Sequence, residues 1–412
     1  IRDSIPAVIN RSWWLTFRLA ASYRRTILSR THILAVVGSL GKTTTTRAIS
    51  AALGCGQPIW YEQGFNNAYP SVARRILGIS PSSPREVIEV GIREPGQMAH
   101  IAQMLRPDIT IVTAIGSDHA KYLRTLEVTR SEKAEMVRIV PPSGKTVLNG
   151  DDPNVLWMAS QTDAETVTFG LGSGNDIRAD GITLDWPAGM RFRVHAFGET
   201  RDARTRLLGR HMVYPFLAAV AVALIEGLTL DQVLPALGSL PPTPGRLRPI
   251  HLEDGQIILQ DDSKGSLEAI EAALDLLSEL PVPRRGVLLG DMQAPGGDPD
   301  ETYEFVGERI AAIASYAIFH GDTQSVQGYL RGATRSGLAP EQIVQATGSA
   351  RDTASVVREL LEPGDVLLCK GRGAKRLERI VLALEGRTVR CDLEECRWGI
   401  LCEQCPLLER GW

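Results

Sequence analysis

The sequence predicts an α/β protein with two successive parallel sheets, and three observations support this class. Short apolar runs alternate with helix-like segments along most of the chain, as in parallel βαβ units. A glycine-rich turn ending in Lys and Thr joins the first run to a helix. A break containing three prolines between Pro241 and Gly245 separates two such sets of elements. The predicted parts are a basic N-terminal extension, a central domain, a second α/β domain and a Cys-rich tail, at 1–31, 32–243, 244–386 and 387–412.

The N-terminal extension is rich in arginine, with six arginines against one acid, Asp3, and with Trp13, Trp14 and Leu15 among them. This pattern predicts a basic amphipathic helix. Such a helix either lies on an anionic membrane surface or packs on the neighbouring domain with its arginines in water. The first alternative predicts a peripheral membrane contact.

The central domain opens with the apolar run 32–37, which fits a buried parallel strand. Similar runs at 87–90 and 109–113 each lie beside helical sequence. From about 165 to 208 the pattern alternates and is punctuated by glycine, which predicts a small antiparallel insert. The second domain repeats the alternation of strands and helices. Its predicted strands are 257–259, 286–290, 317–319 and 366–368.

Composition narrows the function classes. The 412 residues include 45 Lys and Arg against 48 Asp and Glu, so no global charge favours nucleic acid, and we predict no nucleic-acid partner. No run approaches the ~18–20 apolar residues of a membrane span, and the N-terminus lacks the apolar core of a signal peptide. The chain is therefore expected to be cytoplasmic, with membrane association only through the basic helix.

The strongest functional signal is the turn from Gly38 to Thr44, which reads Gly-Ser-Leu-Gly-Lys-Thr-Thr between a strand and a helix. Glycines let the backbone close around phosphate oxygens, while amides at the helix start and Lys42 supply positive charge. The Thr43 hydroxyl is placed to hold Mg²⁺. A purely structural turn does not explain Gly-Lys-Thr, so the motif predicts a nucleoside triphosphate.

This loop has two residues between its glycines, where the common P-loop has four, and it resembles the phosphate loop of the Mur ligases. Further segments resemble motifs of that family in the same order, and those of the second domain are most similar to the members that add D-alanyl-D-alanine. The matching segments are 64–67, 89–91, 106–108, 115–119, 131–135, 149–152, 209–211, 245–246, 261–263, 289–292 and 370–371. The resemblance implies a P-loop ATPase domain, a Rossmann-like second domain, and an ATP-dependent ligase that joins a carboxylate to an amine through an acyl phosphate.

The resemblance also implies roles for individual residues. Nucleotide contacts are expected from Gly38, Ser39, Gly41, Lys42, Thr43, Thr44, Asn67, Arg246 and Asp262. Catalytic roles are expected for Lys42, Glu89, His119 and Lys133, with Mg²⁺ ligands at Thr43, Glu89, His119 and Lys133. The amine substrate or the transferring phosphate is expected at Lys264, Lys370 and Arg372, although each of these could equally be a surface cation.

Lys133 is the most distinctive of these assignments, because the family lysine reacts with carbon dioxide to give an anionic carbamate that binds metal. The reaction needs a neutral amine, which burial or nearby cations favour. The alternative is an exposed lysine beside Glu132 and Glu135.

Two departures from the family pattern bear on the substrates. Met212 and Pro215 stand where the family has asparagines, so the adenine is expected to be recognised more loosely or from elsewhere. Only about thirty residues precede the phosphate strand, which predicts that the N-terminal UDP-substrate domain is missing. The predicted carboxylate is therefore a small or polymer-linked one other than the usual UDP-muramyl peptide.

The tail concentrates four of the six cysteines, Cys391, Cys396, Cys402 and Cys405, within fifteen residues. Four thiolates can surround one tetrahedral Zn²⁺, and this spacing predicts a structural zinc site. An iron–sulfur cluster and free thiols are the alternatives.

Two other functions fit part of the pattern. A P-loop kinase or ATPase switch would use the phosphate loop without forming an amide, but it would need neither His119 nor Lys133. A catalytically inactive scaffold would be expected to have lost some of the catalytic residues, whereas Gly-Lys-Thr, Glu89, His119 and Lys133 are intact.

Overall fold

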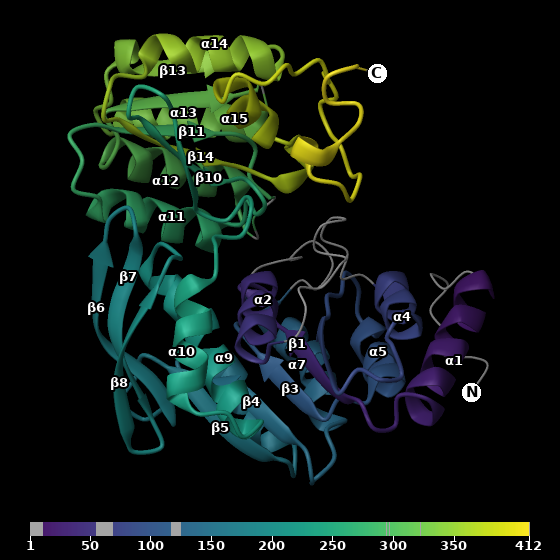
Figure 1. The fold of residues 1–412 in the computed structure, drawn as a ribbon. Helices are drawn as coiled ribbons and strands as arrows, with labels where there is room; N and C mark the ends of the chain where they lie inside the picture. Colours follow the sequence, from purple (N-terminus) through teal and green to yellow (C-terminus); the bar gives the residue numbers. More distant parts are fainter. Residues whose placement is uncertain are drawn as a thin grey trace.

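The computed structural model describes residues 11–54, 69–116, 125–293, 295, 297–321 and 323–411. Two sheets, each covered by helices, form the lower and upper halves of the molecule (Figure 1). The segment 240–247 joins them, between the last helix of the lower half and the first strand of the upper half.

The lower sheet has eight strands in the order β2-β1-β3-β4-β5-β6-β7-β8. Pairing is parallel from β2 to β6 and antiparallel from β6 to β8. The strands are β1 His32–Val37, β2 Arg85–Glu89, β3 Ile109–Val112, β4 Lys145–Asn149, β5 Glu165–Gly170, β6 Ile177–Asp185, β7 Gly189–Ala196 and β8 Glu199–Thr205. The strands predicted near 32, 87 and 109 are confirmed.

The antiparallel insert predicted over 165–208 is present as β6 to β8, and only the first strand of that range, β5, differs. Strand β5 pairs in parallel with β4, and β6 to β8 then extend the same sheet instead of forming a separate unit. Alternating sequence shows that one face of a strand is buried, but it does not show the direction of the neighbouring strand.

Helices cover both faces of the lower sheet, and successive residues of its strand β1 point to opposite sides. Ile33 and Val37 of β1 pack with one set of helices, and Leu34 and Val36 pack with the other. The first set is α1 Arg11–Thr26, α4 Tyr69–Leu77, α5 Gln97–Leu105 and α7 Leu126–Arg138. The second is α2 Lys42–Ala52, α9 Val213–Ile225 and α10 Leu230–Ser239. Short helical turns at Pro153–Leu156 (α8), Trp157–Gln161 (η1) and Arg210–Met212 (η2) complete this half.

The predicted N-terminal helix is present as α1, and it packs on the neighbouring helices α4 and α5. Arg24 is buried in this contact, where it donates to the carbonyl oxygen of Leu105 at 3.0 Å and pairs with Asp108 at 2.9 Å. Trp14 and Leu19 remain exposed. No helix in the described part of the chain is long and apolar enough to cross a membrane.

The upper sheet has six strands in the order β13-β12-β11-β14-β10-β9, all parallel except β9. They are β9 Arg248–His251, β10 Ile257–Asp261, β11 Arg285–Leu289, β12 Tyr316–His320, β13 Ile343–Ala346 and β14 Val366–Lys370. The four strands predicted for this half are confirmed, and β9 and β13 are additional. Its helices are α11 Leu267–Glu279, α12 Pro299–Ala311, α13 Gln324–Arg335, α14 Ala350–Leu360 and α15 Glu378–Leu384, with short turns η3 Pro340–Gln342 and η4 Gly373–Lys375.

The tail beyond α15 has little regular structure, with one turn, η5, at Cys402–Gln404. It nevertheless packs closely, because Val389, Leu401 and Leu408 are buried, and Val389 and Leu408 join the core cluster of α14 and α15. In Figure 1 the tail is yellow and lies on the side of the upper half that faces α2 and α4.

Candidate active site

The phosphate loop follows β1, and two glycines shape it. Gly38 has φ of 143°, and a side chain there would meet the Thr113 hydroxyl at 2.0 Å. Gly41, with φ of 79°, precedes α2 in the left-handed region, and no side chain caps this helix start. Both positions therefore favour glycine, and the first amides of α2 can face an anion.

Two lysines from different helices meet at this loop. The Lys42 ammonium donates to the carbonyl oxygens of Gly38 and Ser39, at 2.9 and 3.0 Å. The Lys133 ammonium, from α7, donates to the same Gly38 oxygen at 2.8 Å. Lys133 is only 2% exposed, so the alternative of a surface lysine is wrong.

Oxygen donors surround the same point. Glu89 ends β2 and is 5% exposed, and Thr43 opens α2 and is 4% exposed. Both line the cleft that contains Lys42 and Lys133. The predicted residues Asn67 and His119 lie outside the described residues.

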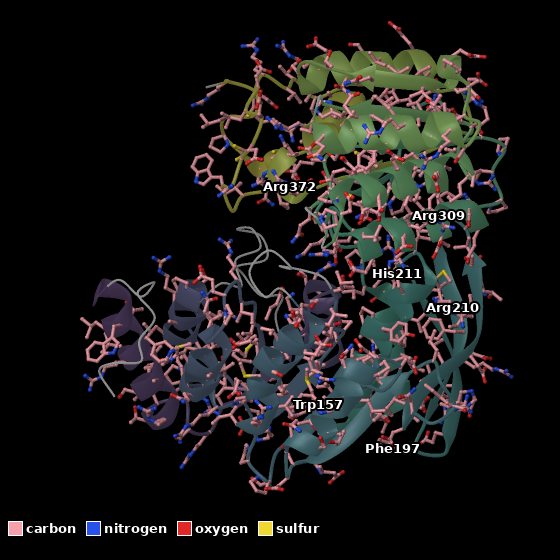
Figure 2. All side chains as sticks on the ribbon, turned by 180° about the vertical axis from the view of Figure 1, so that it is seen from behind. Trp157, Phe197, Arg210, His211, Arg309 and Arg372 are labelled. Atoms are coloured by element: carbon pink, nitrogen blue, oxygen red, sulfur yellow. The ribbon has the colours of Figure 1, made fainter. Side chains whose placement is uncertain are left out.

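A large cleft of about 1130 Å³ runs from the phosphate loop to the upper half. Arg246, from the connecting segment, donates to the Thr43 hydroxyl at 3.2 Å, and Asp262, Lys264 and Arg372 also line the cleft. The structure thus brings the predicted nucleotide residues of both halves to one cavity. Figure 2 shows Arg372 beside the tail and His211 where the two halves meet.

Three polar groups stand at this junction, of which Asp262 and Lys370 are buried and His211 is partly exposed. Burial, with Glu378 nearby, raises the pKa of Asp262 above its ordinary value. Burial lowers the pKa of His211, which favours its neutral form. Lys370 is 1% exposed and pairs with Asp261 at 2.9 Å, so its ammonium holds the ends of β10 and β14 together. That position favours a structural role for Lys370 over the predicted contact with substrate.

An apolar patch in the cleft was not predicted as a site. Phe169 lines it together with Met212, Tyr214 and Pro215, and the Tyr214 hydroxyl donates to Asp151 at 2.9 Å. Met212 and Pro215 are the residues that replace the family asparagines. Their place in the cleft was detectable in the sequence as a departure from a motif, whereas Phe169 had no such signal.

The tail also borders the cleft, which sequence reasoning missed. Residues 396–401 line it opposite the phosphate loop. The predicted substrate residue Arg372 is ion-paired with Glu395 of the tail. Nothing in the sequence connects these two positions, because the contact is made only when the tail folds back.

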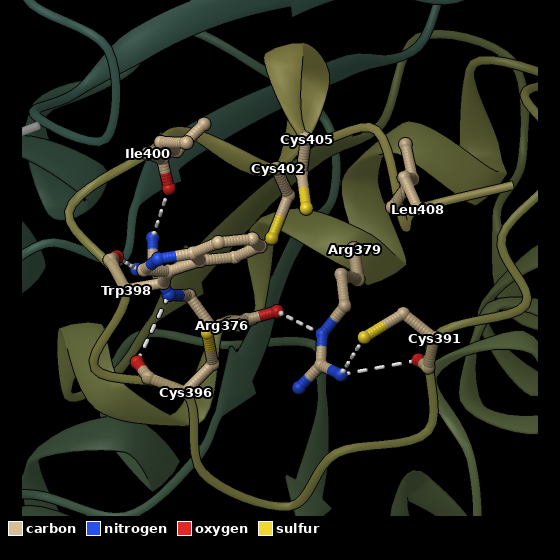
Figure 3. A pocket seen from close by; sticks show the side chains of 9 residues that line it. All are labelled: Arg376, Arg379, Cys391, Cys396, Trp398, Ile400, Cys402, Cys405 and Leu408. Atoms are coloured by element: carbon tan, nitrogen blue, oxygen red, sulfur yellow. Dashed lines mark hydrogen bonds between the residues drawn. The ribbon is translucent and has the colours of Figure 1, made fainter. Parts of the chain in front are cut away.

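The four tail cysteines gather around one small cavity, together with Arg376 and Arg379 (Figure 3). The Arg379 guanidinium donates to the Cys391 sulfur at 3.4 Å. As arranged, however, no three His, Cys, Asp or Glu side chains in the described ranges are placed to hold a metal ion. The gathering of the sulfurs agrees with the prediction, whereas a formed zinc site is absent from these residues.

Comparisons with known proteins agree with this geometry. Residues 36–223 match the Mur ligase middle domain. A UDP-N-acetylmuramoyl-tripeptide–D-alanyl-D-alanine ligase of Mycobacterium tuberculosis is 29% identical, over 85% of this chain and 72% of that protein. The Escherichia coli enzyme of the same name is 27% identical, over 92% of this chain and 82% of that protein.

Solved structures show the same fold. The Thermotoga maritima MurF ligase in complex with ADP matches with a TM-score of 0.78 at 21% identity, over 92% of this chain and 84% of that one. A Mycobacterium tuberculosis folylpolyglutamate synthase complexed with ADP and AMPPCP matches with a TM-score of 0.68 at 15% identity, over 90% and 95%.

Fold and site together define an ATP-dependent ligase with its cleft between two α/β halves. Residues 36–223 are a Mur ligase middle domain, and the chain as a whole is similar to the ATP-dependent, amide-forming ligases of that family. The prediction that it lacks the family's N-terminal UDP-substrate domain is not supported by these comparisons.

Proposed function

We propose that the protein activates a carboxylate as an acyl phosphate with ATP and then joins it to an amine. One observation carries this proposal. Lys42 of α2 and Arg246 of the connecting segment approach the phosphate loop from two separate elements, so positive charge converges where a γ-phosphate would lie. Such convergence stabilises a transferring phosphoryl group.

The residues of the phosphate loop and the connecting segment have separate roles in the proposed reaction. The loop amides and Lys42 would hold the phosphates, together with Arg246, which already lies at the loop from the connecting segment. The carboxylate oxygen attacks the γ-phosphorus and ADP leaves. The amine nitrogen then attacks the acyl carbon, the C–O bond to phosphate breaks, and the amide, inorganic phosphate and a proton are released.

The oxygen donors at the loop fit Mg²⁺, which prefers such ligands. Thr43 and Glu89 would hold it, since both line the cleft at the phosphate loop. When bound, Mg²⁺ neutralises charge on the phosphates. We propose that Lys133 is carbamylated and adds an anionic oxygen, because its burial and the nearby Lys42 are the two conditions that this modification needs.

The names of the relatives define the first substrate pair to test, a UDP-N-acetylmuramoyl tripeptide and D-alanyl-D-alanine. The predicted non-standard carboxylate is tested beside it, as a set of small and polymer-linked carboxylates. ADP release is measured with each carboxylate, with and without the amine, and the product is identified by mass spectrometry. Amide formation supports the proposal, whereas ATP hydrolysis that never yields an amide favours the alternative of a P-loop switch.

We also propose that α1 contacts anionic membranes from its outer face. Trp14, Leu15 and Leu19 are 42%, 57% and 53% exposed, and Arg18 and Arg25 lie on the same helix. Apolar residues beside arginines suit an anionic bilayer surface. Sedimentation with vesicles containing phosphatidylglycerol tests this, and we expect binding to fall for Trp14→Ala with Leu19→Ala and at high salt. Equal sedimentation with neutral vesicles would contradict it.

A further inference from the structure

The tail loop 395–401 is built into the wall of the cleft. Residues 396–401 line the same cavity as the phosphate loop, and Trp398 is 46% exposed there. A large aromatic side chain at the edge of a ligand cleft is a common contact for substrate. The loop therefore has the position of a substrate-binding segment, although it lies beyond every Mur ligase motif in the chain.

Arg376 holds this loop in one conformation. Its guanidinium donates to the carbonyl oxygens of Cys396 and Ile400, both at 3.1 Å, and also to that of Trp398. Arg376 itself lies in the left-handed region, with φ of 54°. A single cation that bonds three loop carbonyls gives the loop a defined shape, and it does so from the segment that carries Arg372.

A carboxylate of the tail loop is ion-paired with the arginine that was predicted to bind substrate. Glu395 pairs with Arg372 and lies 3.9 Å from the Lys375 ammonium. Arg397 lies 3.6 Å from the other oxygen of Glu395, and its side chain is 85% exposed. Two arginines thus flank one carboxylate at the cleft, which is the arrangement that a substrate carboxylate would also find favourable.

We infer that Trp398 and Arg397 of the tail loop determine specificity for the amine substrate. Arg397 and Arg372 would bind a carboxylate of that substrate in competition with Glu395, and Trp398 would cover the substrate's apolar part. The inference rests on the proposed ligase function. It assigns the loop to the amine because the loop belongs to the upper half, across the cleft from the phosphate loop.

The test compares D-alanyl-D-alanine with its C-terminal amide in the product assay, using the full-length protein. For Trp398→Ala we expect KM for the dipeptide to rise about tenfold, while KM for ATP stays within about twofold. For Arg397→Gln we expect the preference for the acid over the amide to fall about tenfold. Calorimetric titration with the dipeptide should show the same loss of affinity without turnover.

Matched variants distinguish a direct contact with the amine substrate from a general effect on folding. Phe305→Ala removes another exposed aromatic, 39% exposed on α12, away from the cleft, and should leave all constants unchanged. Glu395→Gln should lower KM for the dipeptide by freeing Arg372. An unchanged KM in Trp398→Ala together with an unchanged acid preference in Arg397→Gln would overturn the inference, as would a wild-type protein that rejects the dipeptide but accepts amines without a carboxylate. Absence of ADP formation with every substrate pair overturns the proposed ligase function instead.

Discussion

The two halves of the cleft are encoded in different ways. In the lower half, the phosphate loop directly follows β1, and Glu89 ends the neighbouring strand β2, so parallel strands deliver these groups to one edge. In the upper half, Arg372 meets Glu395 only because the tail folds back and Arg376 fixes it. The phosphate-loop side of the cleft is thus determined by local motifs, whereas the side formed by the tail depends on contacts between distant segments.

The largest expected effect tests the phosphate-loop side of the cleft. Lys42→Ala should lower kcat/KM for ATP by about 100-fold to 1000-fold, since it removes a cation that faces the transferring phosphate. Lys145→Ala is the matched control, because Lys145 pairs with Glu165 on the sheet far from the loop. Steady-state ADP release measures both. Wild-type turnover in Lys42→Ala would remove the phosphate loop from the mechanism.

Variants of Lys133 test whether the phosphate-loop side of the cleft is active without carbamylation. We expect Lys133→Ala to lose about 100-fold in kcat, and added acetate or formate to restore part of the loss, since a free carboxylate can replace the carbamate oxygen. Carbon-13 NMR after incubation with labelled bicarbonate should show a carbamate resonance in wild type alone. Full activity in bicarbonate-free buffer would contradict the assignment.

Arg246 joins the halves, and its loss should have a smaller effect. Arg246→Ala removes the bond to Thr43 and should raise KM for ATP about tenfold, while KM for the amine changes little. Arg246→Lys should recover part of the loss because the charge returns. Equal changes in both KM values would show that the two halves are coupled more tightly than this comparison supposes.

The phosphate-loop side of the cleft could be predicted from the sequence better than the side formed by the tail. The structure brings the glycine loop, Lys133 and Glu89 to one cleft, because each lies in a motif at the start of a helix, on a helix or at the end of a strand, and their roles there stay predictions. The direction of β5 was not predicted, since alternation is the same in parallel and antiparallel strands. The position of the tail beside the cleft was not predicted, and the buried Val389, Leu401 and Leu408 hold it there. Such packing depends on residues far apart in the chain.

The smallest expected effect concerns the tail cysteines, where we predict one bound Zn²⁺. Cys391, Cys396, Cys402 and Cys405 all line one cavity. No three of them are placed to hold a metal ion as arranged in the described ranges, so binding would require their side chains to move together. A tetrathiolate zinc site carries two negative charges, and Arg376 and Arg379 at the same cavity would offset them.

Bound zinc should raise the stability of the protein and lower KM for the amine, with little effect on KM for ATP. Because apolar packing and the Arg376 bonds already hold the tail, combined Cys402→Ser and Cys405→Ser should lower Tm by only about 5 °C. It should also raise KM for the amine, since loop 395–401 leads directly into Cys402, while KM for ATP stays unchanged. Glu403→Gln, in the same turn but without sulfur, is the control. Elemental analysis should find one equivalent of zinc in wild type and none in the double variant. Metal-free wild-type protein with four titratable tail thiols and an unchanged Tm in the double variant would show that packing and Arg376 alone order the tail.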